Sequence, residues 1–239
     1  MSVFITRRGT TTMNGTTPEP IVTVDPVFAN NTWDAIIEAC QANAVPSSWA
    51  VGDYRPMAIG NDAYFVVIIG KNHDVYSDGT GIAPLTFQVY DAYGNTTYIM
   101  HDVASNSGSW EESQMRTFNL PNILATMPIE VKTGIREVNK LTSVGQNLVE
   151  INTTADNLFL PSEVEVFGVT TYSVQGEGQQ YEFYKDGNRI KSANGNAVKW
   201  WLRSPQNTSM NNYCAVNTSG YPTYDTAIQD LHISFAFCF

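Results

Sequence analysis

The sequence has few charged residues, and the acidic ones outnumber the basic ones. Only 15% of its 239 residues are charged, with 13 basic and 23 acidic side chains and a net charge of −10. An acidic chain repels phosphate backbones, and we find no basic stripe or nucleic-acid motif, so we expect no nucleic-acid partner. Hydrophobic residues make up 43% of the chain, which indicates a globular protein whose surface relies on Asn, Thr, Ser and Gln.

Cysteine is also scarce. Cys40, Cys214 and Cys238 form an odd, widely spaced set, which is not a disulfide framework, and we interpret them as small buried hydrophobes. We find no Cys/His cluster with metal-ligand spacing, no Ser-His-Asp order and no Gly-rich phosphate loop. We therefore expect no metal, no cofactor and no enzymatic activity.

Long apolar runs are missing. No run reaches the ~18 residues that a membrane span needs, and the longest one, residues 63–69, has the length of a strand. The first residues, MSVFITRRGTTTMNG, lack the apolar stretch of a signal peptide. We expect no membrane insertion and no signal peptide, with synthesis in a cytoplasm.

The pattern along the chain predicts one domain with an appendage. Residues 1–30 are rich in Thr and Pro and are predicted to form an extended N-terminal arm, and residues 31–239 form the domain. The arm is either a frayed tail or an assembly segment that adds strands to a neighbour or anchors the chain in a larger particle.

Periodicity predicts an α+β domain with two early helices, short strands and long polar loops. Thr32 is a candidate N-cap for a helix that ends near Asn43, because Trp33, Ile36, Ile37 and Cys40 share one face. Ser109 and Glu112 suggest a capping box that opens a helix to about residue 118, and a short helix follows from Pro121. Predicted strands are 63–69, a half-buried 85–89 paired with 97–100, 129–131, 135–138, 158–160, 164–167, 200–202 and 233–239, with 181–184 either a brief helix or an edge strand.

Several sequence pieces together resemble a known family. In chain order they are WAVGD at 49–53, VIIG at 67–70, GSW at 108–110, SQMR at 113–116, DNLFL at 156–160, EGQQYEFY at 177–184, KWWLRSP at 199–205 and FAFCF at 235–239. The series resembles a domain of unknown function found in phage virion proteins and bacterial surface proteins, over residues 31–239. Its most specific mark is WWLRSP. Ile233-Ser-Phe-Ala departs from the family, which usually has an Arg-Pro pair before its final Ala-Phe.

The resemblance implies a C-type-lectin-like fold, related to formylglycine-generating-enzyme-like domains. The same fold displays the variable region of diversity-generating retroelement proteins, found in some phage receptor-binding proteins. The resemblance therefore implies a ligand face in long loops near the C-terminus. The Glu-Pro-Asn and Trp-Asn-Asp motifs of calcium-dependent sugar binding in this fold are absent.

WWLRSP itself is interpreted as scaffold. Trp200 and Trp201 occupy adjacent strand positions and face opposite sides, so structural core roles are favoured over ligand stacking. Arg203 is expected to pair with a buried acid or with loop carbonyls, which its planar guanidinium suits.

The segment after Pro205 has the composition of a binding face. Tyr gives large contact area at low entropic cost, and Ser and Asn supply adaptable hydrogen bonds. An ordinary solvated loop is the alternative. The mixture of Asn, Tyr, Ser and Thr also resembles the product of a retroelement that randomises adenines. The candidate ligand-binding residues are Asn207, Ser209, Asn211, Asn212, Tyr213, Asn217, Ser219, Tyr221 and Tyr224.

We therefore expect a virion-associated receptor-binding or adhesion protein of a phage. Its partners would be a bacterial surface glycan or protein and, through the arm, other virion proteins, and we expect a homo-oligomer. One alternative is a purely structural capsid-decoration or tail component. A second is a formylglycine-generating-type oxidase, for which Cys214 and Cys238 are the candidate cysteines.

Overall fold

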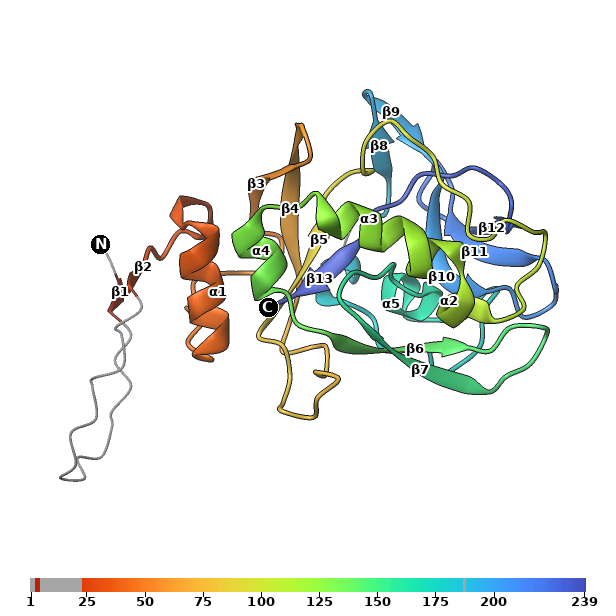
Figure 1. Ribbon diagram of the computed structural model, residues 1–239, viewed down its shortest axis with the longest axis horizontal. Helices are drawn as coiled ribbons and strands as arrows, with labels where there is room; N and C mark the ends of the chain where they lie inside the picture. Colours follow the sequence, from red (N-terminus) through yellow and green to blue (C-terminus); the bar gives the residue numbers. More distant parts are fainter. Residues whose placement is uncertain (1–2, 5–22, 187) are drawn as a thin grey trace.

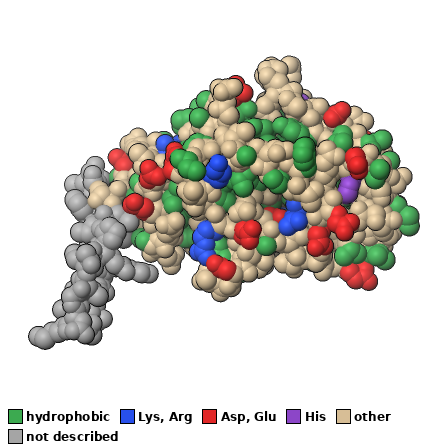
Figure 2. Space-filling view, viewed as in Figure 1, with side chains coloured by type: hydrophobic (Ala, Val, Ile, Leu, Met, Phe, Trp, Pro, Cys, Tyr) green, Lys and Arg blue, Asp and Glu red, His purple; other side chains and the backbone are tan. Residues whose placement is uncertain are grey.

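The fold consists mostly of short strands with a few short helices, in a computed structural model that describes residues 3–4, 23–186 and 188–239. This agrees with the α+β class predicted from the sequence. Among the described residues, no helix is both long enough and apolar enough to cross a membrane. Charged side chains are scattered over the face in Figure 2, among neutral and hydrophobic ones.

A four-stranded antiparallel sheet forms the first half of the core. Its order is β13-β5-β4-β3, with β3 spanning Tyr54–Ile59, β4 Asp62–Lys71, β5 Leu85–Val89 and β13 Ala236–Cys238. The prediction of a half-buried strand at 85–89 was wrong about its burial, because all five residues of β5 are buried. Its two polar side chains have buried partners. The Thr86 hydroxyl donates to Asp74 (2.6 Å), and the Gln88 amide donates to the Ser234 carbonyl (2.9 Å).

Helix α1 (Trp33–Gln41) packs beside this sheet, as Figure 1 shows. The predicted N-cap is confirmed, since the Thr32 side chain accepts a hydrogen bond from the Ala35 N–H (3.2 Å). The Trp33 ring meets Phe87 and Phe239 edge-on, with centroids 5.8 and 6.0 Å apart. The helix is therefore fixed to the sheet through its apolar face.

Most of the predicted arm lies outside the described residues, but its end belongs to the folded domain. Strand β1 (Val3–Phe4) pairs with β2 (Thr23–Val24), and a single 3₁₀ turn, η1, follows at Phe28–Asn30. Val24 and Phe28 are buried in the hydrophobic core. Among the described residues from Thr23 onward, packing into the core begins at Val24, before the boundary at residue 31 that composition predicted.

Short helices cross the middle of the chain: α2 (Ser109–Glu112), a π-helical turn η2 (Met115–Asn119), α3 (Leu120–Ala125) and α4 (Ile129–Gly134). Pro121 lies in the first turn of α3, as predicted. The capping box at Ser109 was wrong: Gly108 is the N-cap residue, at φ +73°, and the Ser109 hydroxyl donates to the Ser143 carbonyl. The strand predicted at 129–131 was also wrong, because Pro128 opens helix α4 there.

The next elements are the hairpin of β6 (Val138–Ser143) and β7 (Ile151–Asp156), helix α5 (Glu163–Phe167) and the 3₁₀ turn η3 (Glu182–Tyr184). The strand predicted at 164–167 is helix α5, because Ser162 and Glu165 form a capping box. Residues 97–100 and 158–160 are not strands either. Each makes a single isolated bridge, Tyr98 to Leu231 and Phe159 to Ala236.

A three-stranded antiparallel sheet lies at the opposite end of the molecule from α1 (Figure 1). Its order is β10-β11-β12, with β10 spanning Trp200–Pro205, β11 Asn212–Val216 and β12 Pro222–Thr226. A small hairpin of β8 (Lys191–Ala193) and β9 (Asn196–Val198) precedes it. The buried side chains of the three-stranded sheet join those of the four-stranded sheet in one continuous hydrophobic cluster.

Candidate functional site

Strand β10 carries WWLRSP, and all six of its residues are buried. The indole N–H of Trp200 donates to the Arg189 carbonyl (3.0 Å), and that of Trp201 donates to the Tyr98 carbonyl (2.8 Å). The two indoles thus bind segments on different sides of the strand, and neither is exposed. They serve the core, where a ligand has no access to them.

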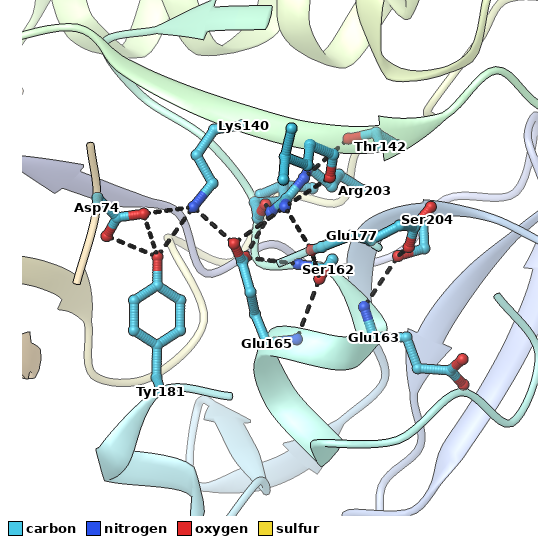
Figure 3. Close-up of polar contacts among 12 residues, drawn as sticks. Asp74, Lys140, Thr142, Ser162, Glu163, Glu165, Glu177, Tyr181, Arg203 and Ser204 are labelled. Carbon is cyan, nitrogen blue, oxygen red and sulfur yellow. Dashed lines mark hydrogen bonds and ion pairs between the residues drawn. The ribbon is translucent and has the colours of Figure 1, made fainter. Parts of the chain in front are cut away.

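Arg203 is the centre of a buried polar network, shown in Figure 3. Its guanidinium donates to both carboxylate oxygens of Glu165, at 2.5 and 3.0 Å. It also donates to the carbonyls of Leu160 (2.8 Å), Leu141 (3.0 Å) and Glu177 (3.2 Å). Arg203 therefore has both of the partners that its sequence context suggested, an acid and loop carbonyls. None of these partners lies on β10. They come from β6, from residues 160–165 and from the loop at Glu177, so Arg203 connects three segments to β10.

Lys140 extends the network from Glu165 to Asp74. Its ammonium nitrogen lies 2.6 Å from a carboxylate oxygen of each acid. The Tyr181 hydroxyl, also buried, contacts the Asp74 carboxylate at 2.9 Å. Burial acts to raise the pKa of Glu165, but Arg203 and Lys140 outweigh it and hold that pKa well below its ordinary value. Glu165 is therefore ionised at neutral pH.

Two further acids hold the loop that joins α5 to η3. Glu177 accepts hydrogen bonds from the Ser204 hydroxyl and from the Ser143 N–H, and burial raises its pKa to about 7. Glu163 accepts from three successive backbone N–H groups, at Thr171, Tyr172 and Ser173. The side chains of Glu163 and Glu177 are buried and bonded to backbone and to a serine hydroxyl, so we assign the network to the scaffold beneath the sheet.

The loop between β10 and β11 is tied down by amide side chains. Asn207 donates its backbone N–H to Tyr172 (2.7 Å) and its side-chain amide to Ser173 (2.8 Å). Asn106 donates its amide to the carbonyls of Ser209 (2.7 Å) and Asn212 (3.1 Å). The predicted ligand residue Asn207 therefore positions this loop.

Three more of the predicted residues also make structural contacts. The Asn212 amide donates to Gln206 (2.9 Å), and the Ser209 hydroxyl accepts from the Asn211 N–H (3.1 Å). With its amide nitrogen turned toward the carbonyls, Asn211 donates to Ala104 (2.8 Å). The amides that suggested an adaptable surface thus hold the loop in one conformation.

The prediction for Tyr213 was wrong. This residue was predicted to contact a ligand, but its side chain is fully buried, and burial raises its pKa. On β11 it pairs with Asp225 of the neighbouring strand, and its side chain lies on the inner side of the sheet. The strand is covered on both sides, because the residues from Tyr213 to Val216 are all buried, so a side chain on either face of β11 lies inside.

The turn between β11 and β12 is ordered by its own first residue. The Asn217 side-chain oxygen accepts from the backbone N–H groups of Ser219 (2.9 Å) and Tyr221 (3.0 Å). Gly220 supplies the left-handed backbone, at φ +80°, that the turn requires. Asn217 thus acts as an Asx-turn residue and fixes the backbone positions of Ser219 and Tyr221.

Three predicted residues near the β11–β12 turn face solvent: Ser219, Tyr221 and Tyr224. Of the other predicted residues, only Asn211, in the loop before β11, is exposed. Tyr221 is 66% exposed and Tyr224 41% exposed. Tyr224 packs edge-on against Tyr172, with ring centroids 5.0 Å apart. Tyr224 lies on the edge strand β12, and Tyr221 comes directly before that strand. We call these three residues together with Tyr172 the hairpin surface.

A second group of exposed aromatic residues was not predicted. Tyr54 of β3 and Phe65 of β4 are each about half exposed, and their rings meet edge-on with centroids 5.3 Å apart. Tyr90 lies 6.1 Å from Tyr54. Their sequence signal was weak, because each is a single aromatic residue in a separate strand or loop and only pairing of the strands brings them together.

The cysteines do not form a reactive site. All three are free thiols in buried positions, and burial raises the pKa of Cys214 and of Cys238 well above the ordinary value. A nucleophilic cysteine needs the opposite shift. Within the part of the chain that the structure describes, no three His, Cys, Asp or Glu side chains are grouped to hold a metal ion.

Comparison with known proteins gives a family but no function. No curated protein and no solved structure matches the chain. Residues 88–238 match the family described as Domain of unknown function (DUF6273), a stretch that contains the whole β10-β11-β12 sheet and most of the buried network. Since this match covers more than half of the sequence, the chain belongs to the DUF6273 family.

Proposed function

We propose that this protein is a receptor-binding or adhesion protein, and that the hairpin surface contacts a bacterial surface glycan or protein. The observation that carries the proposal is the exposure of Tyr224 on an edge strand and of Tyr221 in the preceding turn, which Asn217 holds. Large aromatic side chains on an ordered frame offer contact area without a large loss of conformational entropy on binding.

The chemistry of this surface fits a neutral or weakly charged ligand. Exposed tyrosine rings stack on sugar faces or on apolar side chains, and neighbouring Ser219 and Thr223 supply hydroxyl groups. Asp225, which follows Tyr224 on β12, is neutralised by Lys199 in an ion pair of 2.8 Å. Recognition here would depend on stacking and hydrogen bonds, with little electrostatic steering.

The wider setting is part of the same proposal. The residue series that includes WWLRSP supports a C-type-lectin-like fold and a place in a phage virion. In that setting the N-terminal arm would contact other virion proteins and the protein would be a homo-oligomer. Peptide mass spectrometry of purified phage particles would test the location, and light scattering of the full chain would test the oligomeric state.

Adhesion to bacterial cells tests the binding proposal. We expect the fluorescently labelled protein to adhere to cells of its host, and the double variant Tyr221→Ser/Tyr224→Ser to adhere at least about tenfold more weakly. Tyr54→Ser is the matched control, since it removes an equally exposed tyrosine from the other aromatic group. Loss of adhesion in Tyr54→Ser alone would move the site to the four-stranded sheet.

Treatment of the cells distinguishes the two kinds of receptor. Periodate oxidation of surface sugars abolishes adhesion if the receptor is a glycan, and protease treatment abolishes it if the receptor is a protein. A protein that adheres to no cell of a broad host panel would contradict the proposal and favour the structural alternative, a capsid-decoration or tail component.

A further inference from the structure

Three side chains of the buried network are arranged for a reaction with one another. The Lys140 nitrogen lies 2.6 Å from Oδ1 of Asp74 and 2.6 Å from Oε1 of Glu165. All three side chains are at most 3% exposed. Figure 3 shows the lysine pointing between the two carboxylates, which come from separate segments of the chain.

The Asp74 carboxyl group has the environment of a polarised electrophile. Its second oxygen, Oδ2, accepts from the Thr86 hydroxyl (2.6 Å) and from the Tyr181 hydroxyl (2.9 Å), and the Cys238 thiol lies 3.7 Å away. The lysine faces the other oxygen, Oδ1. Donors placed on one oxygen stabilise the negative charge that develops there when a nucleophile adds to the carbon, in the manner of an oxyanion hole.

Glu165 has the position of a base. Its Oε1 lies 2.6 Å from the lysine nitrogen and also accepts from Arg203 (3.0 Å), while its Oε2 accepts from Arg203 at 2.5 Å, so the guanidinium fixes the carboxylate beside the lysine. The Phe159 ring lies 4.1 Å from the same nitrogen and covers it. An enclosed site strengthens these interactions and excludes the water that would hydrolyse an intermediate.

We propose that Lys140 and Asp74 join through an intramolecular amide bond, with Glu165 as the catalytic base. Glu165 takes a proton from the ammonium group, and the free electron pair of the nitrogen attacks Cγ of Asp74. The C–N bond forms, and the charge that collects on Oδ2 is stabilised by its three donors. Oδ1 then receives the proton held by Glu165 and a second one from the nitrogen, and leaves as water while the C–Oδ1 bond breaks.

The step is balanced without any co-reactant. An ammonium and a carboxylate become one amide and one water molecule, no group is oxidised or reduced, and Glu165 returns to its starting form. Proximity is the main driving force, since the fold holds both reactants at contact distance. The product would connect β6 to the segment that follows β4, 66 residues apart in sequence.

The intact mass of the full-length protein decides the proposal. We expect the folded, purified chain to weigh one water molecule less than its sequence, and a tryptic digest to contain a branched peptide that joins the Asp74 and Lys140 segments. A mass equal to the sequence mass after prolonged incubation would overturn the proposal. This test needs no variant, so it does not depend on whether a mutant folds.

A second lysine in the same molecule is an internal control. Lys191 is equally buried, but its nitrogen faces the carbonyls of Tyr90 and Val89, and no carboxylate of the described residues forms an ion pair with it. After denaturation an amine-reactive reagent should label Lys191 fully and leave Lys140 unlabelled. Equal labelling of both would show that Lys140 forms an ion pair only.

Variants then assign the roles. Lys140→Arg and Asp74→Ala should restore the full sequence mass, whereas Asp74→Asn should lose ammonia instead of water and give the same branched peptide. Glu165→Gln should slow the loss of water at least about tenfold, as expected for loss of general base catalysis. Branched peptide forming in Glu165→Gln at the wild-type rate would remove Glu165 from the mechanism.

Discussion

The interior of this protein and its hairpin surface use charge in opposite ways. Charged residues are scarce, yet in the described part of the chain eight of them are buried: Asp74, Lys140, Asp156, Glu163, Glu165, Glu177, Lys191 and Arg203. The hairpin surface, in contrast, consists of tyrosines and a serine. Buried ions tolerate few rearrangements because each needs its partner, whereas a neutral surface can change its side chains at little cost to the fold.

The largest effect should follow removal of the central cation. Arg203→Met leaves Glu165 and three carbonyl groups without their donor, so we expect a loss of about 3–5 kcal/mol in the free energy of unfolding, measured by chemical denaturation. Lys199→Met is the matched control, because the Lys199–Asp225 pair is about one-third exposed and should contribute less than about 1 kcal/mol. Equal losses in the two variants would mean that burial does not distinguish these ion pairs.

Glu177 should make stability depend on pH. Burial raises its pKa from 4.5 to about 7, so between these values the folded state holds a proton that the unfolded state releases. Stability from this group is complete below pH 4.5 and declines as the pH rises to 7, by about 3 kcal/mol in total. Denaturation midpoints at pH 5, 6 and 7 should therefore fall more steeply in the wild type than in Glu177→Gln. Parallel profiles would contradict the assignment.

A smaller effect is expected where the surface meets the interior. Asn207→Ala removes the amide that holds the Ser173 carbonyl, and we expect a loss of about 1 kcal/mol in the free energy of unfolding. Thr218→Ala, at an exposed position of the β11–β12 turn, is its control and should be neutral. A neutral Asn207→Ala would return Asn207 to the set of candidate ligand contacts.

The smallest effect on stability should come from the hairpin surface. Tyr221→Ser should change the free energy of unfolding by no more than about 0.5 kcal/mol, because this side chain is two-thirds exposed. The same variant should nevertheless weaken adhesion. Thermal denaturation of the protein used in the adhesion assay checks both statements on one sample, and a large fall in melting temperature would show that Tyr221 packs on the fold.

Local sequence signals predicted the elements that local forces determine. Helix α1 was predicted from its N-cap and apolar face, and β4 from its apolar run. Two comparable signals were overlooked. Ser162 and Glu165 form the capping box that makes 163–167 a helix, and Asn194-Gly195 is the hairpin turn between β8 and β9, with both residues at positive φ.

Contacts between distant segments could not be predicted in the same way. Asn106 donates to the carbonyl of Ser209, 103 residues away, and this contact makes an apparently permissive loop rigid. The burial of Tyr213 likewise depends on the distant segments that cover β11, which is buried on both sides from Tyr213 to Val216. A buried acid was expected beside Arg203, but its identity as Glu165 depends on a helix that the sequence pattern had suggested was a strand.

The edge position of β12 bears on how closely copies of this protein can be packed. A free strand edge is a template on which a neighbouring sheet can grow. The Asn217 N–H donates to the Tyr221 carbonyl, and hydrogen-bonded pairs alternate along the two strands from there. The backbone N–H and C=O positions of β12 that point away from β11 are therefore those of Pro222, Tyr224 and Thr226. Proline has no N–H to donate, and the Thr226 N–H already binds the Asp225 side chain (3.1 Å). Many copies could therefore be displayed side by side at high local concentration with little tendency to join edge to edge.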